Sequence, residues 1–463
     1  MRSSFIKTLR ILCLPLVCTI FLVARFNQNQ SYLQIKATVT SEGIQATVPV
    51  DITRTPRPVD NSFLDFNKII NNDTSANGGY PFKRYNPVKP PIFSLKDDTK
   101  EYFVGLSNTT CFISGTDVAS SNRTCVCLPR WTGTDCSVPE SVWASKKFRR
   151  KFTNKLITRR SSPGRVINAI NINHEIDMLE IRLHELYDVV DVFIICESNY
   201  TASGDPKPLF LLPKLRKGFL KEFQDKIVYV WLDHFPKGGK ENGWIADDYL
   251  RTFLWKQGKK QISGLRDDDL FVLTDADEIP HAGVIAFLKN HDGYGEPIFW
   301  RLRWNVFGFF WLSAQEHIEV AAACTIKYLR EGLRDDAIGV RRGTLPKDAD
   351  PSYEALVDEW TIGQNRGQNA GWHCSWCTTI EDMKIKLISA QKSDGTRWGD
   401  FPEKRTSKYL LSLVKEGKWF DGNSAGIRSP VDDATVPAYV LANAAKFSYM
   451  LALPDEVKAS RSR

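Results

Sequence analysis

Three carboxylates follow a short apolar run near the middle of the chain. Asp275, Asp277 and Glu278 come directly after 270–273, which has the length and composition of a buried strand. Alternate residues of an extended chain point the same way, so Asp275 and Asp277 can face one site. Carboxylate oxygens are the ligands that Mg²⁺ and Mn²⁺ prefer. The pattern indicates a candidate divalent-metal site, and a solvated acidic turn before a helix at 282–290 is the alternative.

The elements that would position these acids form a regular alternation. Strands are predicted at 165–171, 189–196, 226–232, 270–274 and 298–304, and helices at 175–187, 246–257 and 282–290. Such alternation predicts an α/β fold with a mostly parallel sheet and helices on both faces. Ligands of such sheets bind at the carboxyl ends of the strands. Glu197, after the second strand, and the acids at 275–278 are therefore expected at one edge.

The N-terminus carries a candidate targeting signal. Arg2, Lys7 and Arg10 precede the apolar run 11–24, and Arg25 follows it. The run is short for a membrane span, which needs about 20 residues, so it fits a signal anchor or the core of a cleaved signal peptide. We favour an anchor at 11–26, with residues 1–10 cytosolic because of their positive charge and the remainder lumenal.

The cysteines agree with an oxidising compartment. Eight of the ten follow the apolar run, and an even number predicts disulfides; they are Cys111, Cys125, Cys127, Cys136, Cys196, Cys324, Cys374 and Cys377. Either Cys374 pairs with Cys377, or each pairs with Cys196 and Cys324. The sequence also has N-glycosylation acceptors at Asn72, Asn108, Asn122 and Asn199.

Composition divides the chain into further regions. The polar, Pro-rich stretch 27–110 is expected to be a flexible stem. The segment 111–137 resembles the second half of an EGF module, which implies Cys111–Cys125 and Cys127–Cys136 pairs; a zinc knuckle is the alternative. A linker at 138–164 contains a run of eight basic residues without an acid at 146–160, which supplies much of the net charge of +8. This run is either a solvated linker or a patch for acidic glycans or lipid head groups, and nucleic-acid binding gains little support.

The region 165–455 resembles a known enzyme family. The blocks DADEIPHAGVIAFLK, FGFFW, GWHCSWC, KLISAQ, RWGD and WFDG, with a seventh block at 232–254, are similar in sequence and order to glycosyltransferase family 17. The resemblance implies a GT-A-like catalytic domain that uses Mn²⁺ and UDP-GlcNAc. It further implies a single-pass type II protein of the Golgi membrane, which adds GlcNAc in β1,4 linkage to the core mannose of N-glycoprotein acceptors. The alternatives are a non-catalytic carbohydrate-binding protein of the same fold and a transferase with another donor or acceptor.

The resemblance also suggests roles for individual residues. Asp275 and Asp277 are expected to bind the metal and take part in catalysis, with His373 as a third ligand or, alternatively, as a structural residue. Candidate donor-binding residues are Glu197, Asp247, Asp248 and Glu278, of which Asp247 and Asp248 also suit a helix N-terminus. Transfer with inversion needs a general base, for which the candidates are Glu319 and Asp400. The chain departs from the family pattern at Thr274, where an Asp is expected, and in 330–370, which matches poorly.

Overall fold

The structure is a computed structural model that falls into two compact units, Met1–Pro58 and Val59–Arg463. It describes residues 92–347, 349–354, 357–364, 367–391 and 395–461, together with the backbone of 9–14, 17–25, 32–40 and 43–47. Asn72 and most of the predicted stem lie outside the described residues.

The described part of the N-terminal unit is a four-stranded antiparallel sheet. Its strands follow the chain order, β1 (Leu9–Leu14), β2 (Val17–Arg25), β3 (Tyr32–Thr40) and β4 (Gly43–Thr47). Strands β1 and β2 occupy most of the predicted anchor, where Pro15 interrupts the apolar run and disfavours a continuous helix. None of the described helices is both long and apolar enough to cross a membrane. Strands β3 and β4 lie in the stretch predicted to be a flexible stem.

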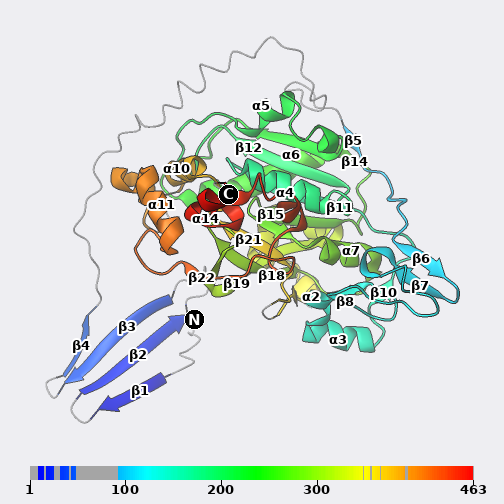
Figure 1. The fold of residues 1–463 in the computed structure, drawn as a ribbon, viewed down its shortest axis with the longest axis horizontal. Helices are drawn as coiled ribbons and strands as arrows, with labels where there is room; N and C mark the ends of the chain where they lie inside the picture. Colours follow the sequence, from blue (N-terminus) through cyan, green and yellow to red (C-terminus); the bar gives the residue numbers. More distant parts are fainter. Residues whose placement is uncertain are drawn as a thin grey trace. The chain divides into compact units, whose positions relative to one another are not determined.

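The larger unit contains a ten-stranded sheet (Figure 1). One half is parallel, as predicted, with the order β13-β12-β11-β15. The bounds of these strands are β11 (Val166–Ile172), β12 (Val192–Ser198), β13 (Ile227–Leu232) and β15 (Leu270–Asp275). Each lies within a few residues of its predicted position, so the parallel half of the sheet is confirmed.

The other half of the sheet corrects the prediction of a mostly parallel arrangement. Strand β19 (Trp311–Thr325) runs antiparallel to both β15 and β18 (Ile298–Val306), because the short connection 307–310 turns the chain straight back. The sheet continues through β21 (Gly371–Ser375) to β16 (Glu278–Pro280). Two short strands, β20 (Trp360–Ile362) and β22 (Gly426–Arg428), pair with β18 and β19.

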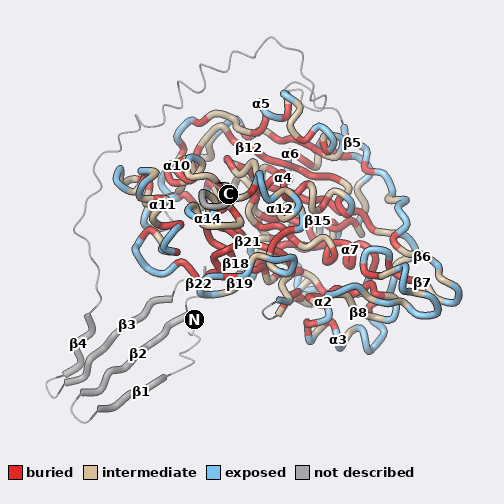
Figure 2. The backbone as a smooth tube through the Cα atoms, in the orientation of Figure 1, coloured by how far each residue is buried: buried red, intermediate tan, exposed pale blue. Residues whose placement is uncertain are grey.

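Helices pack on both faces of the sheet because successive residues of the parallel strands alternate between two cores. On β15, Leu270 and Val272 belong to the core that holds α4 (Ile176–Leu186) and α7 (Ala282–Asn290). Phe271 and Leu273 belong to the core that holds α6 (Gly243–Gly258) and α8 (Ala337–Arg342). Figure 2 shows these strands as the most buried part of the molecule. The predicted helices at 175–187 and 282–290 are confirmed, and the one predicted from 246 begins three residues earlier.

The cysteine-rich segment is folded onto the sheet domain. The predicted pairs Cys111–Cys125 and Cys127–Cys136 are both present. In the segment, β6 (Phe103–Leu106) pairs with β7 (Thr109–Phe112), and β8 (Trp131–Thr132) with β9 (Val138–Pro139). A Cβ placed on Gly283 of α7 would lie 2.9 Å from the Trp131 ring. The basic run forms α3 (Lys146–Thr153), in which Phe148 is buried in the same core as α7.

The structure decides between the two alternative pairings predicted for the remaining cysteines. Cys374 and Cys377 form a disulfide, whereas Cys196 and Cys324 are buried free thiols, so their assignment as disulfide cysteines is wrong. Cys374 lies on β21, which is two strand spacings from β19 with Cys324 and five from β12 with Cys196. Those separations are roughly 10 and 24 Å, whereas the Cα atoms of a disulfide lie within about 7 Å.

The described glycosylation acceptors differ in exposure. Asn108 and Asn122 are exposed, and Asn199 is half-buried. Their glycosylation stays a prediction.

Gly371 should be essential for the junction of β16 and β21. A Cβ there would lie 2.2 Å from the carbonyl oxygen of Ile279, so we expect Gly371→Ala to lower the free energy of unfolding by about 2 kcal/mol. Gly105→Ala is the control, because a Cβ at 105 meets nothing within 4 Å. Urea unfolding measures both variants, and equal effects would contradict the close approach at 371.

Candidate active site

The three predicted acids lie where β15 ends and the chain turns into β16. Thr274 continues the alternation of β15 onto the α4 face, and Asp275 continues it onto the face of α6 and α8. Asp277 and Glu278 follow in the turn and at the start of β16. The turn is therefore accessible to side chains from both faces of the sheet.

Arg182 of α4 holds this turn from one face. Its guanidinium donates to Thr274 Oγ1 at 2.7 Å and to the backbone carbonyls of Asp275 and Glu278. The side chain is fully buried, and burial lowers the pKa of Arg182 to about 10, which leaves it charged at neutral pH. A buried guanidinium with several carbonyl acceptors fixes the backbone that carries the acids.

Arg251 of α6 holds Asp275 from the opposite face. Its Nη2 donates to both carboxylate oxygens of Asp275, at 2.9 and 3.0 Å, and its Nη1 pairs with Asp247. Arg341 of α8 adds a contact of 3.3 Å to Asp275. Burial alone would raise the pKa of Asp275, but the charges of Arg251 and Arg341 outweigh it and hold the pKa below its ordinary value. Asp275 is thus an ionised member of a partly buried charge network.

Glu278 is also held by Arg341. The two groups meet in a two-point contact, with Oε2 accepting from Nη1 at 2.9 Å and Oε1 from Nη2 at 2.5 Å. Oε2 also accepts from the backbone N–H of Asp275 at 3.0 Å. Glu278 therefore closes the turn and holds Arg341, instead of facing open solvent. Arg341 lies in the region 330–370, the part of the sequence that resembles the family least.

Asp277 faces a different set of partners. Lys386 of α10 (Ile380–Ser389) lies 3.2 Å from its Oδ2, and His373 Nδ1 of β21 lies 3.8 Å from its Oδ1. The His373 Nε2 is 2.7 Å from Ser375 Oγ, whereas Nδ1 is buried and has no hydrogen-bond partner among the described residues. Lys386 also lies 3.9 Å from Glu175, after β11. The structure thus brings His373 to Asp277, as the sequence resemblance suggested.

The donors around Asp277 have the chemistry of a partial metal site. No three His, Cys, Asp or Glu side chains in the described parts of the chain are placed to hold a metal ion together. Divalent ions that bind with nucleotides commonly take one or two protein ligands and complete their shell with phosphates and water. Asp277 and the unpartnered Nδ1 of His373 fit such a set, whereas Asp275 and Glu278 are already paired with arginines.

Glu197 is placed differently from the expected donor contact. It is fully buried, and its carboxylate accepts from the backbone N–H groups of Leu211 and Leu212, at 2.7 and 3.1 Å, in α5 (Leu211–Arg216). Tyr229 Oη also donates to it at 2.6 Å. Burial raises the pKa of Glu197 despite these bonds. All the described contacts make Glu197 a buried helix cap.

The other predicted residues lie in separate ion pairs. Asp247 holds Arg251, and Asp248 pairs with Arg342; because α6 begins at 243, both lie in its second turn. Glu319 pairs with Arg301 across β18 and β19 at 3.0 Å. Asp400 pairs with Arg397 at 3.0 Å. No contact connects Glu319 or Asp400 to the acid turn within the described residues, and their catalytic roles stay predictions.

Sequence reasoning missed the cations of the site. A buried arginine on a predicted core helix is a signal that could have revealed Arg182, since an arginine is rarely buried without partners. Arg251 follows Asp247 by four residues, which is a helical ion-pair spacing. Arg341 and Lys386 carry no comparable local signal, because each reaches the turn only through tertiary packing.

Replacement of Arg182 tests its contact with the side chain at position 274. We expect Arg182→Met to lower the free energy of unfolding by about 3 kcal/mol, because it leaves buried carbonyls unpaired. Thr274→Asp should lower the free energy of unfolding by about 2 kcal/mol more in the Arg182→Met protein than in the wild type. The reason is that Arg182 is the cation in contact with position 274, where it would neutralise the charge of a buried carboxylate. Denaturant unfolding of the four proteins measures this difference, and strictly additive effects would contradict the contact.

We expect Lys386 to account for part of the loss of folding stability at acidic pH. Burial alone would raise the pKa of Glu175, but His174 and Lys386 outweigh it and lower the pKa to about 2. A lowered carboxylate pKa stabilises the fold above about pH 4.5, and this stability is lost as the pH falls towards 2.

Lys386→Met should therefore reduce the stability lost between pH 5 and 2.5 by about 1 kcal/mol. Unfolding free energies across this range give the slope, with the exposed Lys155→Met as control. If the slope of unfolding free energy against pH is unchanged in Lys386→Met, Lys386 does not lower the pKa of Glu175.

Comparison with known proteins finds one similar family and several similar relatives. Residues 146–328 match the glycosyltransferase family 17 model. Over 337 residues, 71% of this chain, it is 44% identical to a β-1,4-mannosyl-glycoprotein 4-β-N-acetylglucosaminyltransferase of Rattus norvegicus and 43% identical to the Homo sapiens protein of that name. The match covers 62% of each relative, so the chain spans less than two thirds of their length.

Among solved structures, the mannosyltransferase PcManGT from Pyrobaculum calidifontis in complex with GDP-Man and Mn²⁺ is 14% identical, with a TM-score of 0.24. The match covers 69% of this chain and 85% of that one. Residues 146–328, less than half of the chain, are thus similar to glycosyltransferase family 17.

Proposed function

We propose that this protein transfers GlcNAc from UDP-GlcNAc to the core β-mannose of N-glycans, in β1,4 linkage. The 44% identity to relatives that carry the name of this activity is the observation on which the proposal rests. The cluster of acids and cations at the carboxyl edge of the sheet supports it, because this edge is where α/β folds bind ligands.

The charges around the acid turn suit a departing nucleoside diphosphate. Negative charge grows on the diphosphate as the bond to the sugar breaks, and fixed cations near it lower the barrier. Lys386 and Arg341 are such cations beside Asp277 and Asp275. Asp277 and His373 would hold a Mn²⁺ ion, which supplies Lewis-acid stabilisation of the same charge.

The acceptor side of the reaction needs a general base. A β linkage formed from an α-linked donor is an inversion, so one displacement is expected, in which a general base takes the proton of the acceptor hydroxyl. Glu319 and Asp400 stay the candidates. Each is paired with an arginine, and that arginine would have to release the carboxylate or hold it in place.

We further propose that the protein acts in the Golgi lumen, with 11–26 as a signal anchor. Three disulfides and the exposed acceptors Asn108 and Asn122 support an oxidising, glycosylating compartment. The same features support a partial EGF-like module at 111–137.

Asp277→Asn tests the proposed reaction. We expect it to lower kcat at least 100-fold while the protein stays folded, because it removes a proposed metal ligand beside the diphosphate. The assay combines UDP-GlcNAc with a biantennary N-glycan, with and without Mn²⁺, and identifies the product by mass spectrometry. Asp292→Asn is the control, an exposed carboxylate paired with Arg160 outside the cluster.

Three results would count against the proposal. Wild-type turnover by Asp277→Asn would remove Asp277 from the site. Transfer of another sugar, or to another acceptor, would indicate a related transferase. The absence of both transfer and UDP binding by the wild type would indicate a non-catalytic carbohydrate-binding protein.

A further inference from the structure

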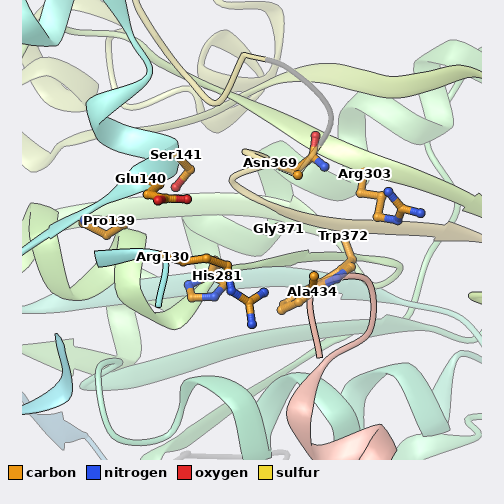
Figure 3. A pocket seen from close by; sticks show the side chains of 11 residues that line it. Arg130, Pro139, Glu140, Ser141, His281, Arg303, Asn369, Gly371, Trp372 and Ala434 are labelled. Carbon is orange, nitrogen blue, oxygen red and sulfur yellow. The ribbon is translucent and has the colours of Figure 1, made fainter. Parts of the chain in front are cut away.

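A pocket away from the acid turn lies between the cysteine-rich segment and the sheet. Figure 3 shows side chains that line it from two sides, Arg130, Glu140 and His281 on the left and Arg303, Asn369 and Trp372 on the right. None of these six residues has a role in the reaction proposed above. The cysteine-rich segment likewise has no part in that reaction, although it is packed firmly against α7.

The cysteine-rich segment and the short helix that follows it supply the charged residues on one side. Arg130 precedes β8, and Glu140 follows β9 as the first residue of α2 (Glu140–Trp143). The Glu140 N–H donates to the carbonyl of Arg130 at 2.9 Å. Arg130 itself has φ 69°, a left-handed conformation that non-glycine residues adopt mainly in constrained turns. The hairpin, closed by Cys127–Cys136, thus presents both side chains from a constrained base.

The sheet supplies the opposite side. Arg303 of β18 and Trp372 of β21 are paired in register, and the next pair along these strands is Trp304 and His373. Neighbouring residues of a strand point to opposite faces. Arg303 and Trp372 therefore face the pocket, whereas His373 faces Asp277. A ligand in the pocket and a sugar at the acid turn would lie on opposite faces of the same two strands.

The charges in the pocket are nearly balanced. Burial lowers the pKa of His281 to about 4, and the charge of Arg130 adds to the effect, so the ring is neutral near pH 6. Its Nδ1 accepts from the Gly283 N–H at 3.1 Å, which leaves Nε2–H as a donor. Arg130 has an exposed partner, Asp433, at 3.4 Å. In the described part of the chain, the Glu140 carboxylate forms no ion pair.

These groups match the chemistry of a saccharide. A sugar hydroxyl both donates and accepts, and the pocket offers donors on Arg130 and His281, acceptors on Glu140 and both kinds on Asn369. The Trp372 and His281 rings lie 5.6 Å apart and give the pocket an aromatic wall. A single carboxylate is a poor metal site. Glu140 in the pocket and Asp433 beside Arg130 offset most of the positive charge that would attract a diphosphate. An uncharged, hydroxyl-rich ligand fits this set best.

We propose that this pocket is a second saccharide-binding site, in which Arg130, Glu140 and Asn369 bind a part of the glycan acceptor other than the reacting sugar. The proposal deepens the glycosyltransferase function and depends on it for the identity of the ligand. It gives the cysteine-rich segment a role in acceptor binding, since the segment forms one side of the pocket.

The test combines direct binding with kinetics on the full-length protein. The variant is Arg130→Ala with Glu140→Ala, and the probe is a free biantennary N-glycan titrated by calorimetry without UDP. We expect the Kd for the glycan to rise about tenfold, because two charged hydrogen-bonding groups are lost. The KM for the glycan should rise similarly, while kcat and the KM for UDP-GlcNAc stay within twofold of the wild type.

The control is Arg123→Ala with Glu101→Ala, which changes the same charges at two exposed positions outside the pocket and should bind as the wild type does. An unchanged Tm of the pocket variant excludes a merely structural effect. If the Tm falls, the conservative variant Arg130→Lys with Glu140→Gln replaces it as the test, and we expect this variant to bind the glycan as the wild type does. Asp277→Asn should keep its affinity for the glycan while losing turnover, which separates this proposal from the reaction.

A wild-type Kd and KM in the pocket variant would overturn the proposal. So would equal competition by the deglycosylated acceptor protein, which would indicate that the pocket recognises polypeptide.

Discussion

The acid turn depends on one buried cation. Arg182 lies in the core between α4 and the sheet, and its guanidinium donates to Thr274 and to carbonyl groups of the turn. A guanidinium without water needs acceptors, and exposed carbonyls at the end of a strand need donors. Each satisfies the other, so the direction in which Asp275, Asp277 and Glu278 project follows from where α4 is packed. The site is thus positioned by the core and not by a loop.

The acids are compensated from both faces of the sheet. Arg251 and Arg341 come from the α6 and α8 face, Arg182 from the α4 face, and Lys386 from a helix late in the sequence. Buried carboxylates without such partners would be protonated or would destabilise the fold. In the proposed reaction, binding of a nucleotide diphosphate beside these cations would redistribute existing ion pairs.

The local parts of this structure were predictable from sequence, and the long-range parts were not. The strands β11, β12, β13 and β15 and the helix α7 were predicted because their apolar periodicity is strong, and the parallel pattern placed the acids at the correct edge. Strand β19 was missed because exposed polar residues in its middle interrupt the pattern. Arg341 and Lys386 could not be predicted, and Cys196 and Cys324 were wrongly included among the disulfide cysteines. Neighbours in space across a sheet leave no mark in the local sequence.

The alternation along β21 makes the two proposed sites depend on a single strand register. Trp372 and His373 face opposite ways only because they are adjacent. Deletion or insertion of one residue in Gly371–Ser375 would move each side chain to the other face of the sheet. The imidazole of His373 would then no longer face Asp277, and the indole of Trp372 would no longer face the pocket. Homologous chains can therefore change length in the loops on either side of β21, but the strand itself should tolerate substitution only. Insertions and deletions in the gene should be absent from these five codons even where the encoded residues vary.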